Sequence, residues 1–301
     1  MADNKNESQV PSEPEAEFVQ AEVVPPRASP AAAPPTAASK MWILWIVIPL
    51  GVLLLVCGGV LVLIVVPAVQ AAGEAAQREQ CRSNLHQIGQ AMQSHCEAYN
   101  HFPQVYVPDE NGKPKHSWRV MLLPYLGEHN LYKKYNLDEP WDSPANQKLA
   151  GMMPKIYHCP SDTLADASSE TSYLMVAGPG TMGPGGKARV AMWDIRDGSW
   201  VTILLVEVAG SGVNWLEPRD WDTSVGDFSI NQGTGAGIGS EHPGAANVLF
   251  CDGKVRTIDE STDPNDLKTY TTRAGFEQPP PLPHRLAGRV AGPEGRRAWL
   301  V

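Results

Sequence analysis

The longest pattern in the chain is an apolar segment near its N-terminus. Every residue from 41 to 73 is uncharged, and residues 42–66 consist mainly of Leu, Ile, Val and Trp. At ~1.5 Å rise per residue, such a helix spans ~37 Å, which is enough to cross a hydrocarbon core of ~30 Å. A cleaved signal peptide is the alternative, but its apolar stretch is usually only ~7–15 residues long. The pattern therefore predicts a transmembrane helix over residues 41–66.

After this segment, apolar residues recur at intervals of three and four positions. They are Cys81, Leu85, Ile88, Met92, Cys96 and Tyr99. This spacing places them on one face of a helix, and polar residues occupy the opposite face. We expect the helix to continue beyond the membrane, to bury this face against a soluble domain, and to end at Phe102-Pro103.

Beyond residue 103 the chain changes to short runs of strand-forming residues separated by Gly and Pro. The clearest runs are residues 172–176, 200–208, 247–251 and 254–258. Asp252-Gly253 joins the last two runs, and Asp-Gly favours a hairpin whose type I′ turn has positive φ at both central residues. The sequence thus predicts a β-rich body behind the long helix.

Composition and charge narrow the class of protein. With 19% charged residues, a net charge of −9 and a pI near 5.4, the chain lacks the basic surface of a nucleic-acid-binding protein. Residues 1–40, rich in Pro, Ala and acidic side chains, and residues 278–301, rich in Pro and Arg, are predicted to be disordered. We expect no nucleic-acid partner.

Catalytic chemistry has one weak candidate. Ser240, His242 and Asp252 are the residue types of a hydrolytic triad, and a hairpin would bring Asp252 near His242. Ser240 and His242 are only two positions apart, however, and no nucleophile elbow surrounds them. We favour a structural role in which His242 caps or braces the strand that leads into the Asp-Gly turn. The sequence predicts no catalytic residue and no enzyme activity.

Cofactor and metal motifs are equally weak. Gly178, Gly180 and Gly183 match a dinucleotide fingerprint as text, but Pro and Gly follow them where a helix should begin. His158-Cys159 with Asp162 lacks a second pair of ligands. We therefore expect a surface loop at 178–186, no cofactor and no metal site.

Several motifs together resemble a known family. They are PAVQAA at 67–72, CRSNLHQIG at 81–89, SWRVMLLPYL at 117–126, DEPWDSPAN at 138–146, HCPSD at 158–162 and SEHPGAANVLFCDG at 240–253. The chain from residue 67 to 276 resembles a large bacterial domain of unknown function that is named for a signature of His, nine residues and Asp-Gly. His242, Asp252 and Gly253 match that signature.

The resemblance implies a type IV pilin-like α+β fold. In such a fold a long N-terminal helix lies half in the membrane and packs its second half on an antiparallel sheet with loop insertions, here over residues 67–277. It also implies a single-pass protein of the inner membrane with a cytoplasmic N-terminus and an exoplasmic domain. The flanking charges alone leave this orientation open, because Arg27 and Lys40 precede the helix while Arg78 and Arg82 follow it.

One departure from the family pattern concerns the helix start. Relatives with prepilin ends carry a basic stretch, a Gly and Phe-Thr-Leu-x-Glu, and none of these precedes Met41. Residues 42–66 also contain no Glu that could pair with the amine of a neighbouring subunit. We therefore expect a fixed membrane anchor without prepilin cleavage.

Five cysteines are present, and Cys57 falls in the membrane segment. The other four permit three pairings. A Cys81–Cys96 bridge is excluded in a continuous helix, because 15 residues rise ~22 Å and a disulfide needs Cα atoms within ~7 Å. The family motifs favour Cys81–Cys159, which leaves Cys96 and Cys251 as a second pair. Four buried free thiols are the alternative.

Two classes of function remain. The first is a non-enzymatic envelope protein that joins a secretion or surface assembly through envelope proteins or through self-association. The second is an exoplasmic module that binds a sugar or a peptide, with the Gly-rich loops 178–186 and 233–239 lining a cleft beside several tryptophans. These tryptophans are Trp193, Trp200, Trp215 and Trp221.

Overall fold

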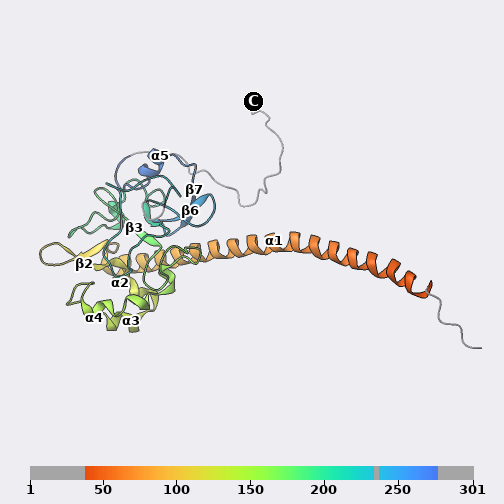
Figure 1. Cartoon of the computed structure of the whole chain (residues 1–301). Helices are drawn as coiled ribbons and strands as arrows, with labels where there is room; N and C mark the ends of the chain where they lie inside the picture. The colour runs from red at the N-terminus through yellow and green to blue at the C-terminus, as the bar shows by residue number, and fades with distance from the viewer. Residues whose placement is uncertain (1–37, 234–236, 277–301) are drawn as a thin grey trace, which may run out of the picture. The chain divides into compact units, whose positions relative to one another are not determined.

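The computed structural model describes residues 38–233 and 237–276 (Figure 1). The tails that the sequence predicts to be disordered lie outside the described residues, except for residues 38–40, which begin a helix. The chain divides into two compact units between residues 63 and 64, and one helix runs through the division.

Helix α1 (Ala38–Tyr99) contains the apolar segment. A stretch of it is long and apolar enough to cross a membrane, and none of that stretch is buried inside the protein. The helix ends at Tyr99 because Asn100 adopts a left-handed φ of 62°, and its N–H donates to the Cys96 carbonyl at 2.8 Å. The predicted end at Phe102-Pro103 is three residues too late, because Asn is one of the few residues that accept this conformation.

The apolar stripe on the second half of α1 packs on the domain. Cys81, Leu85, Ile88 and Met92 are fully buried, as the spacing predicts. Farther along the stripe burial declines, and Tyr99 is 59% exposed. Close packing therefore covers the predicted stripe from Cys81 to Met92 and not its end.

Five strands form the main sheet, in the order β5-β3-β4-β6-β7. They are β3 (Tyr173–Ala177), β4 (Ile203–Glu207), β5 (Trp221–Asp222), β6 (Ala245–Phe250) and β7 (Val255–Asp259). Strands β3, β4, β6 and β7 pair antiparallel, and the short β5 pairs parallel to β3. The predicted α+β fold of a long helix on a sheet is confirmed, with a mixed sheet in place of a purely antiparallel one.

Apolar side chains cover both faces of this sheet. On the α1 face, Leu249 of β6 lies so close to Gly89 that a Cβ at residue 89 would come 2.9 Å from Leu249 Cδ1. On the opposite face, Phe250 packs with Leu267 and Tyr270 at the C-terminal end of the domain. Because both faces are buried, the strands read as continuous apolar runs and not as alternating ones.

Short elements fill the connections. They are β1 (Tyr106–Pro108), β2 (Pro114–Ser117), α2 (Trp118–Leu122), η1 (Leu123–Leu126), α3 (His129–Lys134), α4 (Pro144–Gln147), η2 (Ala150–Met152), η3 (Lys155–Tyr157), η4 (Met192–Asp194) and α5 (Pro264–Thr269). Strands β1 and β2 pair as a small antiparallel sheet. A buried ion pair joins α2 to the start of β5, with Arg119 Nη2 2.7 Å from Asp220 Oδ1.

The turn between β6 and β7 differs from the predicted type I′ turn. Gly253 has a φ of 78°, but Asp252 is not among the described residues with positive φ. The N–H of Gly253 donates to the Phe250 carbonyl at 2.9 Å, and the Phe250 N–H donates to Lys254 at 3.0 Å, which gives a three-residue loop with a left-handed Gly. The Asp252 side chain accepts the Lys254 N–H at 3.0 Å and so stabilises this longer loop.

Candidate functional site

A disulfide joins α1 to the domain. Cys81 lies on α1 and Cys159 in the loop after η3, with their Cα atoms 5.1 Å apart, and both side chains are buried. The bridge that the family motifs favour is therefore present. Because it closes a loop of 78 residues, the chain-entropy model assigns it roughly 4–5 kcal/mol of stabilisation.

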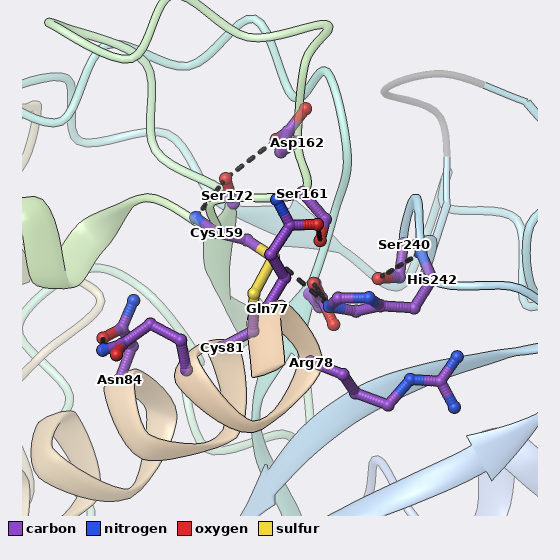
Figure 2. The surroundings of a disulfide bond; sticks show 12 residues. Gln77, Arg78, Cys81, Asn84, Cys159, Ser161, Asp162, Ser172, Ser240 and His242 are labelled. Atoms are coloured by element: carbon purple, nitrogen blue, oxygen red, sulfur yellow. Dashed lines mark hydrogen bonds and ion pairs between the residues drawn. A yellow bond between two sulfur atoms is a disulfide. The ribbon is translucent and has the colours of Figure 1, made fainter. Parts of the chain in front are cut away.

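His242 lies beside this disulfide (Figure 2). Its Nδ1 is 2.7 Å from Glu74 Oε1, and since the carboxylate accepts, Nδ1 carries the proton. On the other side of the ring, Nε2 lies 3.6 Å from Cys159 Sγ and 4.0 Å from Glu207 Oε1. His242 is 1% exposed, so the ring is held between α1, β4 and the disulfide. His242, which lies just before β6, therefore braces α1 against β4 of the main sheet.

Glu207 is a fully buried carboxylate at the end of β4. Its Oε2 accepts from both the backbone and side-chain amides of Asn247, each at 3.1 Å. Burial raises the pKa of Glu207, and the attraction of His242 and the Asn247 hydrogen bonds oppose part of that rise. The site thus combines an imidazole, two carboxylates and two sulfur atoms, and all of these groups are buried except the Glu74 carboxylate, whose side chain is 35% exposed.

The loop that carries Cys159 is held by polar contacts. The Cys159 N–H donates to Ser172 Oγ at 3.0 Å, and that hydroxyl donates to Asp162 Oδ2 at 2.8 Å (Figure 2). Asn84 of α1 donates to the carbonyl of His158 at 3.0 Å. Asp162 also accepts the N–H of Gly210 at 3.1 Å, so its carboxylate links the Cys159 loop to the segment that follows β4.

The three triad-type residues do not assemble. His242 precedes β6 and Asp252 follows it, so the six strand residues at ~3.3 Å each separate them by roughly 20 Å. Asp252 instead pairs with Arg256, at 2.7 Å. Ser240 Oγ accepts the backbone N–H of His242 at 3.2 Å and, within the described part of the chain, makes no hydrogen bond with the His242 ring. The expectation that the hairpin brings Asp252 near His242 is wrong.

The second predicted disulfide is also wrong. Cys96 and Cys251 are both free thiols in the structure. Residues near Cys251 meet α1 about one to three turns before Cys96: His86 Nδ1 lies 3.3 Å from the Gly253 carbonyl, and a Cβ at Gly253 would meet Gln93. Cys251 is 1% exposed, and burial raises its thiol pKa well above the ordinary value.

Only part of the predicted cleft forms. A cleft of about 640 Å³ lies beside the 178–186 loop and includes Trp221. Trp193 and Trp200 are exposed elsewhere at 72% and 65%, and Trp215 is buried, with its Nε1–H donating to the Ala150 carbonyl. The described residues of the 233–239 loop do not line this cleft. The 178–186 segment follows β3 as a loop and leads into no helix, as expected.

Glu74 and Glu207 were not predicted as site residues. The sequence marks both positions, because Glu74 is the first charged residue after the uncharged segment and Glu207 interrupts an otherwise apolar strand. A carboxylate in a buried strand is rare without a partner. Neither position identifies its partner, because His242 is 168 residues from Glu74.

Comparison with known proteins gives one match. A family model described as a protein of unknown function (DUF1559) matches residues 70–191 and 212–265, which is more than half of the chain. No curated protein and no solved structure matches significantly. The matched residues contain α1 from Gln70 onward, the disulfide, His242 and most of the sheet. The chain therefore belongs to the DUF1559 family.

Proposed function

We propose that this protein is a non-enzymatic, membrane-anchored, pilin-like envelope protein that acts as a structural or interaction component of a secretion or cell-surface assembly. The continuity of α1 carries the proposal. The first part of this helix is apolar and exposed, and its second part forms one side of the domain core. One element thus serves both as lipid anchor and as packing surface.

The disulfide supports an exoplasmic domain. Disulfides persist in oxidising compartments and are rare in the cytosol. With Cys81 and Cys159 outside, the N-terminus is cytoplasmic and α1 crosses the inner membrane once. The missing Glu within residues 42–66 supports a fixed anchor and not a subunit that assembles through that residue.

Two exposed tryptophans support a role in protein contacts. Trp193 and Trp200 are 72% and 65% exposed, and tryptophan is enriched where proteins bind one another. Each ring offers a large apolar area that contact with a partner would remove from water. These two positions are the first to test for contact with a partner or with a second copy of the chain.

The test is cross-linking and affinity capture of the full chain from detergent-solubilised membranes. We expect an envelope protein, or a second copy, to be captured in stoichiometric amounts, and a double Trp193→Ala and Trp200→Ala variant to capture less than half as much. Val225→Ala is the control, since Val225 is even more exposed, at 84%, but small. Recovery of a monomer alone, or equal capture by the double variant, contradicts the proposal.

A second candidate function is binding of a sugar or peptide in the cleft beside the 178–186 loop. It is favoured by the buried Asp220 Oδ2 and Trp221 Nε1, which line this region and have no hydrogen-bond partner among the described residues. Titration with oligosaccharides and short peptides should then change tryptophan fluorescence, and Trp221→Phe should reduce that change. No response to either class removes this candidate.

A further inference from the structure

Four atoms that can ligate a metal meet beside α1. They are the two sulfur atoms of Cys81 and Cys159, Nε2 of His242 and a carboxylate oxygen of Glu207, and all lie within 4.8 Å of one another. All four residues are buried, and they come from α1, the loop after η3, β4 and the loop before β6. In the disulfide form the two sulfur atoms are bonded to each other and do not ligate a metal as thiolates.

We propose that the dithiol form of the protein binds one Zn²⁺ through Cys81, Cys159, His242 and Glu207. Zinc prefers four ligands in a tetrahedron, and bond lengths of ~2.0–2.3 Å place those ligands about 3.3–3.8 Å apart. Nε2 of His242 is already 3.6 Å from Cys159 Sγ and 4.0 Å from Glu207 Oε1. Opening the disulfide lets the sulfur atoms separate toward the same spacing.

The surrounding hydrogen bonds suit such a site. Glu74 accepts the Nδ1 proton of His242 at 2.7 Å, which leaves a lone pair on Nε2 and fixes the orientation of the ring. Asn247 holds Oε2 of Glu207 through two donors, while Oε1 faces the imidazole. Glu74 and Asn247 therefore orient two of the four ligands, His242 and Glu207, as neighbouring hydrogen-bond partners do in characterised zinc sites.

Charge balance also favours a dication. Two thiolates and the Glu207 carboxylate would place three negative charges in a buried region, which is strongly unfavourable without a cation. Zn²⁺ would leave one net negative charge. Arg78 offsets the charge of the neighbouring Glu74, with 3.7 Å between their side chains.

The chemistry of the two states balances. On zinc binding, each thiol releases one proton to solvent, while Nε2 and the carboxylate each donate a lone pair. When a small disulfide such as oxidised glutathione oxidises the site, the two thiolate sulfur atoms form the Cys81–Cys159 bond and give two electrons to the reagent, which also takes two protons from solvent. The reagent becomes two thiols, and Zn²⁺ is released. In either state α1 stays linked to the domain at this position.

The test uses the full chain in detergent, reduced with a phosphine that is then removed without oxygen. Co²⁺ serves as a spectroscopic probe for zinc. We expect one equivalent of Co²⁺ to give a thiolate-to-metal absorption band, one equivalent of Zn²⁺ to remove the band, and the disulfide form to give none. Absence of the band in reduced, folded protein overturns the proposal.

Matched variants separate ligands from bystanders. Glu207→Gln keeps the side-chain shape and should lower zinc affinity at least tenfold. His242→Ala should lower it by at least the same factor. Glu74→Gln, which changes only the partner of the His242 ring, should lower it about 10–100-fold. The free thiols are controls, so Cys96→Ser and Cys251→Ser should bind zinc like the parent. Circular dichroism checks that each variant is folded. Unchanged affinity in folded Glu207→Gln, or loss of the band in Cys251→Ser, contradicts the assignment.

Discussion

At the scale of single residues, His242 makes the contacts that connect the most distant parts of the domain. One ring nitrogen meets Glu74 on α1, and the other faces the disulfide and Glu207 on β4. The ring therefore links three elements through polar atoms, of which those of His242 and Glu207 are buried and those of Glu74 are partly exposed. Removing it leaves at least one buried carboxylate without its partner, which is costly.

We predict that His242→Ala lowers the free energy of unfolding by about 1–3 kcal/mol, because a buried polar partner is lost. Chemical denaturation of the oxidised protein measures this change. Ser240→Ala is the comparison, and we expect a smaller loss, since the Ser240 hydroxyl contacts the His242 backbone and not its ring. Equal unfolding free energies for the parent and His242→Ala would show that the ring does not brace the fold.

Gly253 gives a second prediction at this scale. Its φ of 78° is strained for a β-branched residue, and a Cβ there would come 2.6 Å from Gln93 Nε2. Gly253→Val should cost about 1–3 kcal/mol. Gly253→Asn is the matched variant and should cost less, because Asn tolerates left-handed φ. The assignment of this turn fails if Val and Asn are equally tolerated in thermal unfolding.

At the scale of elements, the close contact between α1 and β6 depends on Gly89. Gly89→Leu should destabilise the domain by about 1–3 kcal/mol, because the added side chain would overlap Leu249 in a packed core. Gly73→Leu, on an exposed part of the same helix with no atom within 4 Å of the added Cβ, should have little effect. Similar melting temperatures for the two variants would mean that α1 does not pack on β6 at this point.

The helix and its buried face were predictable because a 3.6-residue period needs only local information. Strands β3, β4, β6 and β7 were located within a few residues because runs of strand-forming residues between Gly and Pro are also local signals. Other features were not predictable, and two of them show why. Strand β5 consists of only two residues, too few to show a pattern, and the Glu74–His242 pair joins positions 168 residues apart. The sequence contained both partners but nothing that identified them as neighbours.

At the scale of the whole molecule, an apolar segment leads into a domain of the DUF1559 family through one helix. The disulfide and the Glu74–His242 contact both involve residues of α1 between positions 74 and 81. A covalent bond and a polar cluster therefore link α1 to the rest of the domain.

The most direct test of this account is a fusion of alkaline phosphatase to the C-terminus of the full chain, assayed in membranes washed with alkaline carbonate. The enzyme becomes active only where its own disulfides form, so it reports the compartment of the domain. We predict high activity that stays with the washed membranes. Activity in the soluble periplasmic fraction, or an inactive fusion that is membrane-bound, would contradict an exoplasmic domain anchored by residues 42–66.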